Sequence, residues 1–167
     1  LNYSYENESF YWFTGNFVQG LFSYRNGWLL YTPIMIFALI GVFLSQKVDK
    51  GLFWASAIVI ILHIYITFSW WCWWYGGSYS QRAMIEIYPL LALPAALLIQ
   101  QVLKAKWFFV AATFSVLTLF TGYNLFTTRQ YQLTLIHYDS MTKEAYESIF
   151  LQRWWPQNYN DLIDPPD

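Results

Sequence analysis

The sequence predicts an all-α membrane protein: four transmembrane helices with outer amphipathic and irregular segments, forming part of a larger helical bundle. Of its 167 residues, 57% are hydrophobic and only 11% are charged, whereas a soluble domain carries about 25% charged residues. A soluble core of this size would not bury the remaining apolar surface, so we expect contact with a lipid bilayer. Nine basic residues against ten acidic ones leave no basic surface for nucleic acid.

Four apolar stretches have the length of about 20 residues that a bilayer requires. Two prolines in the third, Pro89 and Pro94, are tolerated where neighbouring helices satisfy the freed carbonyl groups. The fourth carries a stripe of small residues that lets another helix approach closely. We therefore expect further transmembrane helices, from the same protein or from partner subunits. The predicted spans, within a four-span region over 27–126, are residues 27–45, 52–71, 84–103 and 107–124.

Lysine residues in the short loops predict how the spans are oriented. Loop 46–51 contains Lys47 and Lys50, and turn 101–106 contains two further lysines. Basic residues concentrate in short cytoplasmic loops, so we expect both loops on the cytoplasmic side. Both termini of the chain, and the tryptophan-rich loop between the second and third spans, are then extracytoplasmic.

The N-terminal flank, residues 1–26, combines aromatic side chains with scattered Gly and Asn. This mixture predicts an outer interfacial segment with a short helix around Phe10–Phe17. The chain starts with Leu1 rather than Met, which favours a portion of a longer protein.

The C-terminal flank, residues 127–167, is predicted to form an extracytoplasmic extension. Apolar residues recur there with helical periodicity beside a polar face, which indicates a short helix at about 140–153. Asp139 or Ser140 would cap its N-terminus, because short polar side chains accept from the free amides of the first turn.

Ionisable residues inside a span are costly and therefore mark candidate functional positions. His63 lies near the middle of the second span, where it either hydrogen-bonds to a polar side chain of a neighbouring helix or belongs to a proton relay. Arg82 and Glu86 are four residues apart at the outer end of the third span. They either form an ion pair that anchors the helix, or Arg82 binds an anionic group such as phosphate while Glu86 orients it.

The tryptophan-rich loop carries the most informative pattern. Gly76 and Gly77 permit a tight turn, and aromatic faces stand next to hydroxyl, amide and guanidinium donors. Such a surface suits a sugar ring and a phosphate; an interface turn would use the same residue types. We find no cluster with metal-ligand spacing and expect neither a metal nor a cofactor. The candidate substrate-binding residues are Trp74, Tyr75, Gly76, Gly77, Ser78, Gln81, Arg82 and Glu86.

Three segments of the sequence resemble segments of a known group of proteins. They are Arg25-Asn26-Gly27-Trp28-Leu29 with Tyr31-Thr32-Pro33, the loop Trp74-Tyr75-Gly76-Gly77-Ser78 with Gln81-Arg82, and residues 137–146. They resemble segments of bacterial multi-span glycosyltransferase-like proteins that use polyprenyl-phosphate-linked sugars. These proteins have the C-type fold related to dolichyl-phosphate-mannose protein mannosyltransferases. The third segment is similar to the C-terminal extension of Bacteroidetes members.

The resemblance implies a C-terminal portion of such a transferase in the bacterial inner membrane. Its outer loop would help bind a lipid-linked sugar donor on the outer face. The family keeps its catalytic acidic residue in a large outer loop that has no counterpart here, so we identify no catalytic residue in this chain. Two alternatives remain: a non-catalytic accessory subunit of a respiratory or secretory inner-membrane complex, and a channel built on His63.

Overall fold

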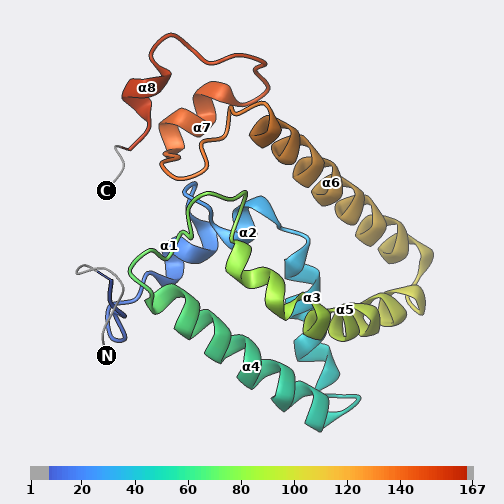
Figure 1. The fold of residues 1–167 in the computed structure, drawn as a ribbon. Helices are drawn as coiled ribbons and strands as arrows, with labels where there is room; N and C mark the ends of the chain where they lie inside the picture. Colours follow the sequence, from blue (N-terminus) through green and yellow to red (C-terminus); the bar gives the residue numbers. More distant parts are fainter. Residues whose placement is uncertain (1–7, 165–167) are drawn as a thin grey trace.

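The computed structural model describes residues 8–164, and this part of the chain consists of helices and loops with no β-strand. One isolated antiparallel bridge joins Phe10 to Trp70. The all-helical prediction is therefore confirmed. The elements in chain order are α1 (Phe17–Phe22), α2 (Trp28–Tyr31), α3 (Met35–Ser45), α4 (Lys50–Ser69), the 3₁₀ helix η1 (Arg82–Ile87), α5 (Tyr88–Leu103), α6 (Trp107–Gln132), α7 (Lys143–Ile149) and α8 (Tyr159–Leu162) (Figure 1).

Three helical stretches are long and apolar enough to cross a membrane: Lys50–Ser69, Arg82–Leu103 and Trp107–Gln132. They coincide with the second, third and fourth predicted spans. The membrane character of the chain follows from these stretches, because apolar helices of this length satisfy their own backbone groups in lipid. The last of them, α6, continues eight residues beyond the predicted end at 124.

The first predicted span, 27–45, is wrong as a single helix. The helix α2 ends at Tyr31, and α3 begins only at Met35. Pro33 has no amide proton and restricts the backbone of the residue before it, and Thr32 leaves the helical region with φ −128° and ψ 61°. The 11 residues of α3 measure about 16 Å, which is roughly half the thickness of the hydrocarbon layer.

Local chemistry explains where α4 and α5 begin. The side chain of Asp49 accepts hydrogen bonds from the amides of Gly51 and Leu52, at 2.7 and 3.1 Å, and so caps α4. Pro89 lies in the first turn of α5, where the missing amide proton costs nothing. Pro94 lies inside α5 and is buried against α3 at Gly41, which has no side chain to hold the two helices apart.

The membrane-facing half of the chain is built around one apolar core. This core joins α2, α3, α4, η1 and α5, whereas α6 contacts mainly α5 and stands apart from α4 (Figure 1). None of the most apolar part of α6 is buried within the described chain. The core residues are Trp28, Ala38, Val42, Ile60, Phe68, Met84, Ile87 and Leu91.

The C-terminal extension has a second core, formed by Tyr31, Leu135, Ile136, Met141, Ala145, Tyr146, Ile149 and Tyr159. Its helix α7 is shorter than the predicted 140–153, and its cap is Thr142, whose Oγ1 accepts from the amide of Ala145 at 3.1 Å. The prediction of Asp139 or Ser140 as the cap is wrong, because the carboxylate of Asp139 is engaged elsewhere, as described below.

The N-terminal flank also differs from the prediction. No helix forms at Phe10–Phe17; α1 begins where that segment was expected to end. The preceding residues run along the end of α4 instead, since the amides of Tyr11 and Asn16 donate to the carbonyls of Ser69 and Phe68 at 2.6 and 2.9 Å. Residues 1–7 of the predicted outer segment lie outside the described residues.

Candidate functional site

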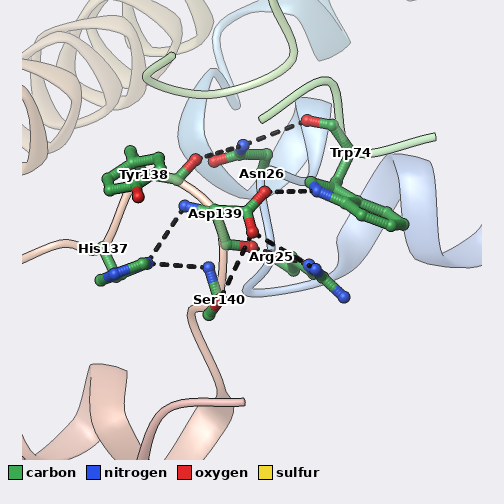
Figure 2. Close-up of polar contacts among 7 residues, drawn as sticks. All are labelled: Arg25, Asn26, Trp74, His137, Tyr138, Asp139 and Ser140. Carbon is green, nitrogen blue, oxygen red and sulfur yellow. Dashed lines mark hydrogen bonds and ion pairs between the residues drawn. The ribbon is translucent and has the colours of Figure 1, made fainter. Parts of the chain in front are cut away.

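The tryptophan-rich loop closes over a carboxylate from the C-terminal extension. Trp74 is 7% exposed, and its indole Nε1 donates to Oδ1 of Asp139 at 2.5 Å. The guanidinium of Arg25 lies over the ring of Trp74, 3.7 Å from its centroid. In Figure 2 the three side chains meet from three separate segments of the chain. One face of the predicted sugar-stacking ring is therefore covered by Arg25.

Arg25 and Asn26 fasten these segments together. The Nε of Arg25 donates to the backbone carbonyl of Asp139 at 2.7 Å, and its guanidinium is 3.6 Å from the carboxylate. The buried side chain of Asn26 donates to the carbonyls of Trp74 and Tyr138, at 3.1 Å each (Figure 2). We call the set Arg25, Asn26, Trp74 and Asp139 the outer latch. Opposite charges held together at low exposure, with hydrogen bonds from Arg25, Asn26 and Trp74 across three segments, restrict the movement of this set.

The sequence-based prediction did not assign Arg25, Asn26 or Asp139 to a site, and it considered Asp139 only as a helix cap. Asp139 lies 65 residues from Trp74 and 114 residues from Arg25 along the chain. No periodicity connects positions so far apart. Their only signal in the sequence was that each belongs to a segment that carries the resemblance.

The glycine turn is packed against the outer latch. A methyl group on Gly76 would collide with Oδ1 of Asp139, so only glycine fits there. Gly77 has φ +80° and faces open space, and Tyr75 also has a positive φ, of 46°. The turn thus needs Gly76 for its close approach and Gly77 for its backbone conformation.

Two more of the predicted site residues stabilise the loop from within. Gln81 is 1% exposed, and its Nε2 donates to the carbonyl of Trp73 at 2.7 Å. The hydroxyl of Ser78 donates to the carbonyl of Tyr75 at 3.2 Å. These side chains use their donors inside the protein.

Arg82 and Glu86 are the charged members of the predicted site; both are exposed, and no ion pair joins them. They belong to the 3₁₀ helix η1, where each residue advances by about 120°. Residues four apart therefore point about 120° away from each other, whereas in an α-helix they would share a face. Both charges act on Tyr75: burial raises its pKa, Glu86 adds to that rise and Arg82 opposes it.

His63 supports the start of η1. Its Nε2 lies 2.8 Å from the carbonyl oxygen of Ala83. A carbonyl oxygen only accepts, so Nε2 carries the proton that is donated in this bond. The contact fits the structural interpretation of His63, with a backbone carbonyl in place of the expected side-chain partner.

A cavity of about 500 Å³ lies between the end of α6 and the C-terminal extension. Among the residues 8–164 that the structure describes, no Asp, Glu, Lys or Arg lines it, and half of its wall residues carry an aromatic ring. Its wall residues include Tyr131, His137, Tyr138, Trp155, Tyr159 and Asn160.

The imidazole of His137 connects this cavity to the outer latch. Its Nδ1 accepts from the amides of Asp139 and Ser140, at 3.2 and 2.9 Å (Figure 2). Burial lowers the pKa of His137 against the opposing effect of Asp139. The neutral ring therefore carries its proton on Nε2, the nitrogen that remains available as a donor.

In the part of the chain that the structure describes, no group of three or more His, Cys, Asp or Glu side chains is placed to hold a metal ion. Comparison of the chain with protein families, with curated proteins and with solved structures finds no match. The geometry of the loop, the outer latch and the cavities is thus the basis for a functional proposal.

Proposed function

We propose that this chain is the C-terminal, membrane-embedded portion of a glycosyltransferase-like protein that helps to bind a polyprenyl-phosphate sugar donor at the outer face of the bacterial inner membrane. The observation that carries the proposal is Arg82. Its side chain is exposed at the start of a membrane-capable stretch, and it makes no hydrogen bond or ion pair with any described residue. A guanidinium in this position suits the phosphate of a lipid-linked donor.

The outer latch supports this proposal by holding the loop in place. Since Trp74, Gly76 and Gln81 are fixed by contacts inside the protein, the backbone leading into η1 is fixed as well. Arg82 then projects from a rigid base, which reduces the entropy lost when a ligand binds. In this proposal Tyr75, Gly77 and Glu86 border the bound phosphate and sugar.

The aromatic cavity supports the sugar part of the proposal. Uncharged aromatic walls with hydroxyl, amide and imidazole groups suit a neutral ligand that has both apolar faces and hydroxyl groups. Tyr138 lines this cavity, and the side-chain amide of Asn26 donates both to the carbonyl of Tyr138 and to the carbonyl of Trp74. The cavity and the loop are therefore neighbours.

The proposed topology has four membrane crossings. In this arrangement α2 and α3 together make the first crossing, broken at Pro33, and the two lysine-bearing loops lie in the cytoplasm. The tryptophan-rich loop and the C-terminal extension then lie on the outer face, where lipid-linked sugars are consumed.

The test is to replace Arg82 in the full-length protein and to measure binding of a polyprenyl-phosphate sugar in detergent micelles. Loss of charge-assisted hydrogen bonds to phosphate predicts that Arg82→Ala weakens binding by about ten- to a hundredfold, with partial retention in Arg82→Lys. Lys143→Ala is the matched control, because Lys143 is an exposed cation on α7 whose ion pair is with Glu147 of the same helix. Equal donor affinity in Arg82→Ala and the control would refute the assignment.

A second candidate function is that of a non-catalytic accessory subunit in a larger membrane complex. The exposure of α6 favours this second function, because the most apolar part of α6 is unburied within the described chain. The same helix carries a stripe of small residues on which a helix of another subunit can pack closely: Ala111, Ser115, Thr118 and Gly122. Purification in mild detergent distinguishes the two. A stable monomer that binds the sugar donor supports the transferase, whereas a stoichiometric partner without donor binding supports the subunit.

A further inference from the structure

A second cavity, of about 590 Å³, lies where α6 ends, next to the segment after α7. It differs from the aromatic cavity in its charge. Arg129 contributes from the last turn of α6, and Arg153 contributes from the loop that follows α7. No Asp or Glu of the described part of the chain lines the cavity.

The side chains of the two arginines have no ion-pair or hydrogen-bond partner among the residues that the structure describes. Both arginines are exposed. Two guanidinium groups that line one space without a carboxylate create a positive potential that an anion would relieve. Their planar donors match the oxygen atoms of a phosphate group.

The position of the cavity along α6 matches the level of lipid headgroups. From Trp107 to Phe126 the helix rises about 29 Å, close to the thickness of the hydrocarbon layer. Arg129 lies one turn further and is therefore at the polar boundary. Beside it, Leu151 and Trp154 are 72% and 76% exposed, and both line the cavity. Apolar side chains at this level contact lipid chains, and tryptophan favours the headgroup region.

A buried acceptor in the same cavity adds a second, independent observation. Gln130 lines the cavity and is 2% exposed, and its Nε2 donates to the carbonyl of Ile149 at 2.9 Å. Its Oε1 has no hydrogen-bond partner within the described chain. A buried acceptor without a partner costs free energy unless a ligand or water supplies a donor. A hydroxyl of a headgroup, or of a protonated phosphate, is such a donor.

We propose that Arg129 and Arg153, with Gln130 beside them, form a binding site for the phosphate group of an anionic membrane lipid, whose acyl chains extend past Leu151 and Trp154. This site is separate from the one proposed at Arg82 and requires no sugar. It fixes the C-terminal extension on the membrane surface through the end of α6.

The experiment uses the purified full chain in lipid nanodiscs. One set is made of phosphatidylcholine alone, and the other contains a minority of phosphatidic acid; lipid retained by the protein is measured by native mass spectrometry. Inorganic phosphate and glycerol 3-phosphate, added to the phosphatidylcholine nanodiscs, test a soluble source of the same phosphate group. The variants are Arg129→Gln, Arg153→Gln and the double variant, and Lys143→Gln is the control that removes one exposed charge outside the cavity.

We expect phosphatidic acid to be retained by the wild type and by Lys143→Gln. We expect about tenfold weaker retention in each single arginine variant and loss in the double variant. Saturable binding of a soluble phosphate, lost in the same variants, would confirm the phosphate site and assign it to a soluble ligand. Retention that is equal in the double variant and in Lys143→Gln, with thermal melting showing both folded, would overturn the proposal. Because Arg82 is intact in all of these variants, the result is independent of the sugar-donor proposal.

Discussion

Replacing Asp139 with alanine would remove the carboxylate at the centre of the outer latch. The side chains of Arg25 and Asp139 are 13% and 20% exposed, so the pair is largely withdrawn from water. Removing one partner of a buried ion pair costs about 3–5 kcal/mol, and a buried indole N–H without an acceptor costs about 1–3 kcal/mol. Partial exposure and the retained bond from Arg25 to the backbone carbonyl reduce the sum, and we expect a loss of about 3 kcal/mol.

This loss can be measured by thermal melting of the detergent-solubilised chain. For a chain of this size, about 3 kcal/mol corresponds to a decrease in Tm of about 6–12 °C. Asp139→Asn keeps an acceptor for Trp74 but not the charge, so we expect roughly half of the decrease. Glu147→Ala is the control, because it breaks an ion pair at the surface: the side chains of Glu147 and Lys143 are 62% and 59% exposed. We expect this variant to change the free energy of unfolding by less than about 1 kcal/mol.

The reasoning would be refuted if Asp139→Ala melted at the same temperature as Glu147→Ala. A decrease in Asp139→Asn as large as that in Asp139→Ala would show that the charge, and not the hydrogen bond to the indole, carries the effect.

Three other changes have definite expected outcomes. Gly41→Ala should lower the free energy of unfolding by about 1–3 kcal/mol, because the new methyl group would collide with the carbonyl of Pro94. Gly122 faces open space on α6, and Gly122→Ala should raise the free energy of unfolding by about 0.5–1 kcal/mol. Equal effects of the two substitutions in thermal melts would contradict the close contact between α3 and α5. Burial lowers the pKa of His137, so the folded state binds a proton at this ring less readily than the unfolded state does. The stability of the fold is therefore unaffected by this titration above the ordinary histidine pKa of about 6.5. Stability decreases as the pH falls from there through the lower pKa of the folded state. Melting at a series of pH values should show this loss in the wild type and not in His137→Gln, and an identical slope in both would exclude His137 as its cause.

Several local features could be predicted from the sequence because they depend on neighbouring residues alone. The apolar stretches that became α4, the η1–α5 unit and α6 were recognisable from length and composition. The break between α2 and α3 is also due to a local feature, Pro33, but the prediction treated residues 27–45 as one continuous helix in spite of this proline. The cap of α7 moved to Thr142 because Asp139 was already bound to Trp74, which is a tertiary effect.

The predicted binding residues separate into two groups that the sequence did not distinguish. Trp74, Gly76 and Gln81 turned out to be buried or packed inside the protein, and Arg82 remained exposed. All of them lie within one short loop of similar composition. Trp74 and Gly76 lie against Asp139 of the extension, more than 60 residues later in the chain, whereas Gln81 is held by the carbonyl of Trp73 within the loop.

Composition and apolar run length alone determined that this chain is helical and belongs in a membrane, since each run must satisfy its own backbone in lipid wherever the others lie. Only the tertiary structure decided which distant polar groups come together: Asp139 contacts Arg25 and Trp74, and Arg129 and Arg153 line one cavity. Such contacts join distant positions, and no periodicity encodes them because their geometry is fixed by how the extension packs against the ends of the helices.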